Sequence, residues 1–255
     1  MRPDRSLARV FLGFDSREAI AFHVLHQSLI TRSSIPISVT PLALNTLADW
    51  HQRPVDPRQS TEFAFTRFLT PALCRFKGWA IFMDCDMIVS RDIAELWELR
   101  DSRYAVQVVK HDYTPTTAEK FLHQPQTVYP KKNWSSVILF NNARCRALTP
   151  AYVNTASGLD LHQFKWLESE ELIGSLPPEW NHLVGEQPTN SSVPVANAHF
   201  TIGGPYFSDY ANSDYATEWL REAVQAFVGL EQPMLDRLTR ILPAVTTNGL
   251  TDTRQ

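Results

Sequence analysis

The chain has 255 residues, of which 44% are apolar, enough to bury the core of one domain of ordinary size. Acidic residues outnumber basic ones by 27 to 24, which gives a formal net charge of −3. This balance argues against a broad nucleic-acid-binding surface, because such a surface needs an excess of Lys and Arg to neutralise phosphates. A small anionic ligand needs only a local cluster of cations and is compatible with this charge.

Cysteine content and hydropathy bear on the compartment. The three cysteines, Cys74, Cys85 and Cys145, show no short paired spacing, which argues against a disulfide framework and against structural zinc. The apolar run at residues 10–12 is too short for a signal peptide, and no run reaches the roughly 18 apolar residues of a membrane span. We therefore expect a cytoplasmic protein without a transmembrane segment, for which peripheral membrane association stays open.

The beginning of the chain alternates between strand-like and helix-like patterns. Residues 9–14 and 35–44 are β-rich, and the apolar spacing of residues 20–29 is helical. Apolar positions at three-to-four spacing predict a further helix over 62–76, with Pro71 as a defect near its end.

The alternation continues to about residue 150. A continuous apolar run at 79–83 is typical of a strand buried on both faces of a sheet. Asp92 and Glu95 form a capping-box pattern ahead of a short helix, and β-rich runs follow at 104–109 and 137–140. This pattern predicts an α/β fold with a mostly parallel sheet.

After about residue 149 the sequence changes character. Loops and short helices precede an amphipathic helix at about 215–227, and the chain beyond Pro243 has the composition of a frayed tail. We find no internal repeat.

Asp84 and Asp86 follow the buried run directly. Residues two apart in extended backbone point the same way, so these carboxylates lie on one side at roughly 6.5 Å Cα separation. Such a pair holds a hard cation and leaves positions for diphosphate oxygens. The alternative is that both aspartates only begin a turn. Their place after a buried strand favours a site, because buried acids are costly unless a cation meets them.

Five segments along the chain form an ordered set. They are TRFLTP at 66–71, Asp84-Cys85-Asp86, NWSSVILFN at 133–141, LPPEWN at 176–181, and His199-Phe200-Thr201 with Gly203-Gly204. Together they resemble glycosyltransferase family 8, which includes bacterial galactosyl- and glucosyltransferases and glycogenin, and they come in the order of that family. The resemblance runs from about residue 9 to residue 207.

The resemblance implies a GT-A-like, Rossmann-type nucleotide-diphospho-sugar transferase fold. It implies metal-dependent transfer of a hexose from a nucleotide-sugar, a UDP-sugar in particular, to a carbohydrate or glycoconjugate acceptor with retention of configuration. We expect a single domain over 1–243, with a nucleotide-binding part at about 9–145, an acceptor- and metal-completing part at about 146–230, and a flexible tail at 244–255.

The resemblance also implies roles for individual residues. Asp84, Asp86 and His199 hold Mn²⁺ or Mg²⁺, and the imidazole shifts the preference toward Mn²⁺. The implied donor-binding residues are Phe14, Asp15, Arg67, Asp84, Cys85, Gly203 and Gly204. Gln163 is the implied catalytic residue, beside the reacting sugar carbon. Candidate contacts with sugar or acceptor are Lys110, His111 and Trp180.

Simpler interpretations compete with several of these roles. Asp15 also fits a helix cap, and His199 fits an ordinary hydrogen-bonded histidine. Trp180 fits core filling, and Lys110 with His111 fits an exposed loop.

One departure from the family pattern concerns the diphosphate. The family's C-terminal lysine falls at or beside Pro205, and the neighbouring glycine is displaced by one residue. Phosphate contact then has to come from elsewhere, with Arg67, Lys131 and Lys132 as candidates. The two lysines also fit a solvated loop.

A second departure leaves other functions open. The family's DQD segment corresponds to residues 162–164, which keep only the glutamine. A catalytically weak nucleotide-sugar binding module is therefore one alternative. A nucleotidyltransferase is another, although residues 13–17 match a Gly-rich phosphate loop poorly.

Overall fold

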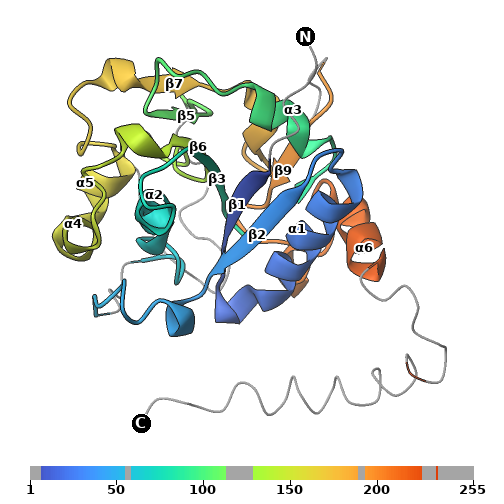
Figure 1. Cartoon of the computed structure of the whole chain (residues 1–255). Helices are drawn as coiled ribbons and strands as arrows, with labels where there is room; N and C mark the ends of the chain where they lie inside the picture. Colours follow the sequence, from blue (N-terminus) through green and yellow to red (C-terminus); the bar gives the residue numbers. More distant parts are fainter. Residues whose placement is uncertain (1–6, 55–58, 113–128, 189–192, 226–233, 235–255) are drawn as a thin grey trace.

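A computed structural model describes residues 7–54, 59–112, 129–188, 193–225 and 234. Its centre is a six-stranded sheet in the order β2-β1-β3-β6-β5-β7 (Figure 1). The strands are β1 (Ala8–Gly13), β2 (Ile37–Leu42), β3 (Trp79–Met83), β5 (Val106–Val108), β6 (Val137–Asn141) and β7 (Ile173–Ser175). Only β6 among these runs antiparallel to its neighbours. The predicted α/β fold with a mostly parallel sheet is confirmed.

A three-stranded sheet in the order β4-β9-β8 lies beside the first. Its strands are β4 (Met87–Val89), β8 (His182–Leu183) and β9 (Asn197–His199). The chain passes from β3 into β4 through residues 84–86, so the aspartate pair lies where one sheet gives way to the other. β4 pairs antiparallel with β9, which places Met87 opposite His199. This register carries a histidine distant in sequence to the aspartates.

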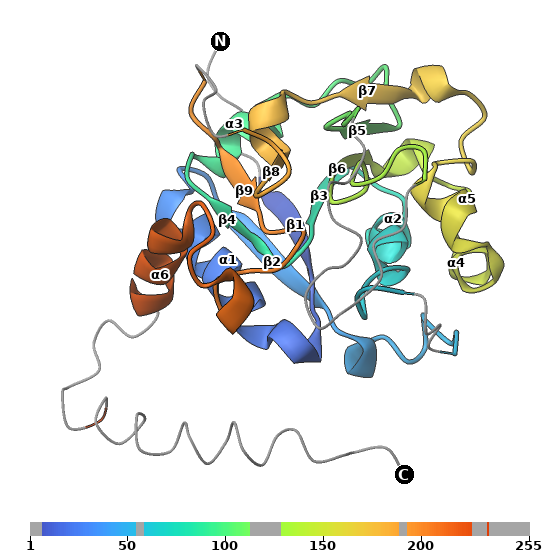
Figure 2. The same ribbon diagram turned by 180° about the vertical axis from the view of Figure 1, so that it is seen from behind.

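In the described part of the chain, six α-helices surround the sheets. They are α1 (Ala19–Arg32), α2 (Thr70–Leu73), α3 (Ile93–Glu98), α4 (Pro150–Thr155), α5 (Gly158–His162) and α6 (Ala216–Gln225). α1 and α6 lie side by side, joined by an ion pair between Arg32 and Glu222, and α4 and α5 lie at the other end of the molecule (Figures 1 and 2). Among the described residues no helix is long and apolar enough to cross a membrane.

Two hydrophobic cores hold these layers together. The main core includes β3 and β6, central strands whose apolar side chains are buried on both faces of the sheet. It continues as far as Trp180. A smaller core joins Val24 of α1, Ala198 of β9 and Trp219 of α6. The second sheet is therefore fixed to α1 and α6 by its own apolar contacts.

The predicted helix over 62–76 is wrong in extent. Residues Thr66–Leu69 form a 3₁₀ turn, and α2 begins only at Thr70. Pro71 lies in the first turn of α2, where its missing N–H costs nothing, rather than near a helix end. Arg75 and Phe76 then adopt left-handed backbone angles, which stop the helix.

Other predicted boundaries differ less. The strand expected over 35–44 is β2, which runs through Pro41; this is tolerated because β2 is an edge strand. The helix expected at 215–227 is observed as α6, which covers 216–225. Residues 226 and 227 of the expected helix lie outside the described residues, as does the predicted tail at 244–255.

Candidate metal and donor site

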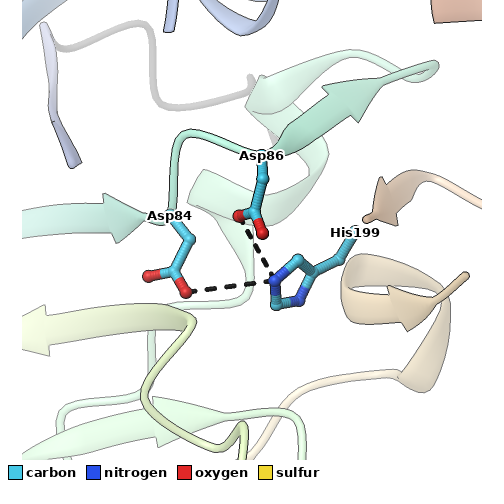
Figure 3. Close-up of side chains that lie close together, drawn as sticks. All are labelled: Asp84, Asp86 and His199. Carbon is cyan, nitrogen blue, oxygen red and sulfur yellow. Dashed lines mark ion pairs between the residues drawn. The ribbon is translucent and has the colours of Figure 1, made fainter. Parts of the chain in front are cut away.

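Asp84, Asp86 and His199 form one cluster at the junction of the two sheets. One ligand atom from each lies within 4.8 Å of the others, and all three residues are buried. His199 Nε2 lies 3.3 Å from Asp86 Oδ1 and 3.9 Å from Asp84 Oδ2 (Figure 3). Two carboxylates and an imidazole nitrogen converge on one point, which is the donor set of a divalent-metal site.

Arg67 balances part of this negative charge. Its Nη1 lies 2.7 Å from Asp84 Oδ1 and donates to the Ser135 carbonyl at 2.9 Å. The guanidinium carbon lies 5.2 Å from the Phe63 ring centroid and 5.0 Å from that of Phe82. The 3₁₀ turn that replaces the expected helix start thus delivers a buried, always-charged arginine directly to one of the aspartates.

Asn181 holds the far side of the His199 ring. Its Oδ1 lies 2.9 Å from His199 Nδ1. Its Nδ2 donates to the Asn133 carbonyl at 3.1 Å and lies 3.0 Å from His111 Nε2. Burial, followed by the nearby His199 and His182, lowers the pKa of His111 to about 3. The imidazole of His199 is therefore supported by a buried polar network that extends to His111.

The two donor residues expected at the end of β1 have well-defined local roles. Asp15 caps the turn that precedes α1: its Oδ1 accepts from Arg17 N at 2.9 Å, and its Oδ2 lies 2.6 Å from Arg17 Nη2. Phe14 packs edge-to-face against Phe22, with ring centroids 5.6 Å apart. Asp15 therefore acts as the helix cap that the simpler interpretation expected. A donor contact by Asp15 or Phe14 stays a prediction.

Glu18 is a buried acid beside the site that the sequence reading overlooked. Only 2% of it is exposed, and its Oε2 accepts from Tyr206 Oη at 2.7 Å. The Cys85 thiol donates to its Oε1 at 3.7 Å. Burial, and then the negative charge of Asp86, raise the pKa of Glu18 to about 8. Cys85, which lies between the two aspartates in sequence, is fully buried, and its side chain faces Glu18. A donor contact by Cys85 stays a prediction.

Gly203 and Gly204 lie against tyrosine rings. A Cβ on Gly203 would come within 2.4 Å of the Tyr210 ring, and a Cβ on Gly204 within 2.2 Å of the Tyr206 ring. Glycine is therefore required here by close aromatic packing, independently of any phosphate.

Trp134 contacts Lys110 and His111, two of the residues expected to touch sugar or acceptor. Its Nε1 donates to the His111 carbonyl at 2.8 Å. Lys110 Nζ and Lys131 Nζ lie 5.7 Å and 5.9 Å from its ring centroid. Lys131 Nζ also pairs with Glu170 Oε1 at 2.6 Å, so this lysine is engaged by an acid of its own.

Gln163 and Trp180 lie in different settings. Gln163 is the C-cap residue that follows α5, and its carbonyl accepts from Lys131 Nζ at 3.1 Å. The adjacent Lys132, also a candidate for phosphate contact, is buried. Trp180 belongs to the main core with 2% of it exposed, and Asn197 Nδ2 donates to its carbonyl at 2.9 Å. A stacking contact between Trp180 and a sugar would require the indole to leave the core.

His162 is a further residue without an assigned role in the sequence reading. Its Nδ1 lies 2.7 Å from Ser135 Oγ, and its ring packs edge-to-face on Phe68. Burial and then the neighbouring Arg67 lower its pKa to about 3, so it is neutral at ordinary pH. A neutral ring suits this position, because a second cation beside Arg67 would be repelled.

The signals for the overlooked residues were partly present in the sequence. Asn181 and Ser135 belong to segments that carried the family resemblance, but those segments did not say which atoms meet. Glu18 lies only three residues after Asp15, yet its burial depends on Tyr206 and Cys85 from distant parts of the chain. These contacts follow from tertiary structure and not from local pattern.

Comparisons with known proteins agree with this geometry. Residues 17–156, more than half of the chain, match the model of Glycosyl transferase family 8. Protein CDI of Arabidopsis thaliana is 44% identical over 223 residues, which cover 84% of this chain and 85% of that protein.

Solved structures share the fold at low sequence identity. The galactosyltransferase LgtC, solved with donor and acceptor sugar analogs, has a TM-score of 0.55 at 11% identity, covering 88% of this chain and 98% of that chain. GlyE of Streptococcus pneumoniae has 0.53 at 13%, covering 85% and 60%. The bifunctional glycosyltransferase WbbM has 0.53 at 16%, covering 85% and 51%, so this chain spans about half of WbbM. These likenesses confirm the expected GT-A-like fold.

Proposed function

Because this chain belongs to glycosyl transferase family 8 and is a glycosyltransferase, we propose that it transfers a hexose from a UDP-sugar, using a divalent cation held by Asp84, Asp86 and His199. The observation that carries the proposal is the convergence of these three side chains at the junction of the two sheets. Mn²⁺ suits this mixed oxygen and nitrogen donor set better than Mg²⁺.

The cation, Arg67 and Asn181 would each have a separate role at this site. When bound, the cation would neutralise the negative charge that gathers on the leaving diphosphate. Arg67 orients Asp84 through its 2.7 Å charge-assisted contact. Asn181 holds the His199 ring with Nε2 toward the carboxylates. Because the three side chains are already assembled and buried, little reorganisation is needed when donor and cation arrive.

The finer features of the activity are part of the proposal. The family resemblance supports UDP as the nucleotide, retention of configuration, and Gln163 as the residue nearest the reacting sugar carbon. The acceptor would be a carbohydrate or glycoconjugate. We place the protein in the cytoplasm, with a peripheral membrane contact open, and expect no nucleic-acid partner because the formal net charge is −3.

The second candidate function follows from Pro205, which stands where the family has a diphosphate-binding lysine. Lys131 was a candidate to replace that lysine, but its ammonium group pairs with Glu170. A nucleotide-sugar binding module with weak turnover is the second candidate for this reason.

Calorimetry with UDP tests the proposal and separates the candidates. We expect UDP binding to require Mn²⁺ and Asp86→Asn to weaken it, because each carboxylate both ligates the ion and offsets its charge. Asp101→Asn is the matched control, since Asp101 pairs with Arg103 away from the cluster and should bind UDP normally. Equal UDP affinity in chelator would contradict the proposed site.

A donor screen completes the test. Mn²⁺-loaded protein is incubated with UDP-glucose, UDP-galactose and their N-acetyl forms, and UDP release is measured. Release or transfer with one of these donors supports the enzyme. Binding of UDP without turnover of any donor favours the binding module.

A further inference from the structure

Asn181 occupies a position from which it controls the His199 ring. It is fully buried at the end of a 3₁₀ turn, Pro178–Asn181, that leads directly into β8. Its amide contacts three groups from three other segments: His199 Nδ1 at 2.9 Å, the Asn133 carbonyl at 3.1 Å and His111 Nε2 at 3.0 Å.

The Asn133 carbonyl fixes which way round this amide lies. A carbonyl oxygen only accepts hydrogen bonds, so the group of Asn181 that faces it is the NH₂. The Asn181 oxygen consequently faces His199 Nδ1. An amide oxygen also only accepts, and therefore His199 Nδ1 carries a hydrogen.

The position of that hydrogen decides what the other ring nitrogen can do. A neutral imidazole has a single N–H, so a hydrogen on Nδ1 leaves a lone pair on Nε2. Nε2 is the nitrogen that faces Asp86 at 3.3 Å and Asp84 at 3.9 Å. The tautomer that Asn181 selects is thus the one that presents a metal-ligating lone pair to the carboxylates.

The remaining hydrogen of the amide agrees with this assignment. It points at His111 Nε2, which must then be an acceptor, as a neutral ring with its own hydrogen on Nδ1 provides. The buried setting of His111 keeps that ring neutral.

We infer that Asn181 is a positioning residue for the metal site, which sets the tautomer and orientation of His199 through its side-chain oxygen. The inference rests on the proposed function in that it takes His199 as a ligand. Loss of an outer partner of a ligating histidine typically weakens metal affinity by about 10- to 100-fold.

Two substitutions at position 181 separate the hydrogen bond from simple packing. Asn181→Leu keeps approximate size but removes the acceptor, and should weaken Mn²⁺ affinity by about 10- to 100-fold. Asn181→Asp keeps an oxygen toward His199 Nδ1 and should retain affinity within a few-fold, even though its second oxygen opposes the Asn133 carbonyl and lowers stability. Asn197→Leu removes another buried amide, one that contacts Trp180 and Met87, and should leave Mn²⁺ affinity unchanged.

Mn²⁺ affinity is measured by electron paramagnetic resonance of the free ion without nucleotide, beside urea unfolding in chelator. Equal Mn²⁺ affinity for Asn181→Leu and the parent, or equal loss in both position-181 variants, overturns the inference.

A second readout needs no metal and no variant. Nitrogen chemical shifts of the His199 ring in the metal-free parent protein should show a protonated Nδ1. An unprotonated Nδ1 overturns the inference even if Asn181→Leu fails to fold. If the parent binds no Mn²⁺ but Nδ1 is protonated, the proposed metal site fails while the role of Asn181 in setting the tautomer stands.

Discussion

Replacing Glu18 with glutamine should remove a pH dependence from the stability of the metal-free protein. Glu18 lies buried, held by the Tyr206 hydroxyl and the Cys85 thiol, and close to the charge of Asp86. Burial first, and then Asp86, raise its pKa from the ordinary 4.5 to about 8. The folded protein therefore keeps a proton on Glu18 over a pH range in which the unfolded chain releases it.

The sign and size of the effect follow from this difference. Because the folded state binds more protons than the unfolded state, the free energy of unfolding falls as pH rises from the unfolded to the folded pKa. A rise in pKa from 4.5 to about 8 corresponds to at most about 5 kcal/mol, lost progressively across that window. Glutamine cannot ionise but still accepts from the Tyr206 hydroxyl, so it should remove most of this loss.

Urea unfolding in chelator, at pH values from about 5 to about 9, measures the difference between Glu18→Gln and the parent. The variant should gain stability relative to the parent as pH rises, and should be close to it at the acidic end. Glu222→Gln is the matched control, because Glu222 is also a buried glutamate but pairs with Arg32. It should lose stability without flattening the pH dependence. A constant difference between Glu18→Gln and the parent across the range would refute the reasoning.

Two further outcomes follow from the buried groups around the site. Arg67→Met should cost about 3–5 kcal/mol in urea unfolding with chelator, because it removes the buried cation that pairs with Asp84. Arg103→Met removes a surface pair with Asp101, in which the arginine is 78% exposed, and should cost much less. Equal costs would contradict the importance of the buried pair. All three cysteine thiols should react slowly with Ellman's reagent in the native protein and rapidly in urea, since they are buried and burial raises the pKa of each; rapid reaction of a thiol without urea would show that its surroundings open.

The elements that the sequence predicted well are those whose pattern is set by burial. The run at 79–83 is apolar at every position because β3 is buried on both faces of the sheet, so the sequence predicted both the strand and its end at Asp84. The region 62–76 misled because its apolar spacing is helical, while its backbone is divided into a 3₁₀ turn and a short helix. The division brings Arg67 to Asp84, a tertiary contact that local spacing does not encode.

In the candidate site, too, local sequence predicted some residues, whereas others are placed by contacts with distant parts of the chain. Asp84 and Asp86 were identifiable from their spacing and from their position after a buried strand, although Cys85 and Asp86 form a bend between β3 and β4 rather than the extended backbone that was expected. His199 was recoverable only through the family resemblance, since its approach depends on the register of β9 against β4. Glu18 and Asn181 escaped notice because nothing in their neighbouring residues marks them as buried.

The charges around the aspartates are only partly balanced in the metal-free protein. Asp84 pairs with Arg67, whereas Asp86 faces the Nε2 lone pair of His199 and lies close enough to Glu18 to raise the pKa of that acid. A protonated Glu18 adds no negative charge beside the two aspartates. A divalent cation would offset the charge that Arg67 leaves unbalanced, and its binding should therefore stabilise the fold as well as complete the site.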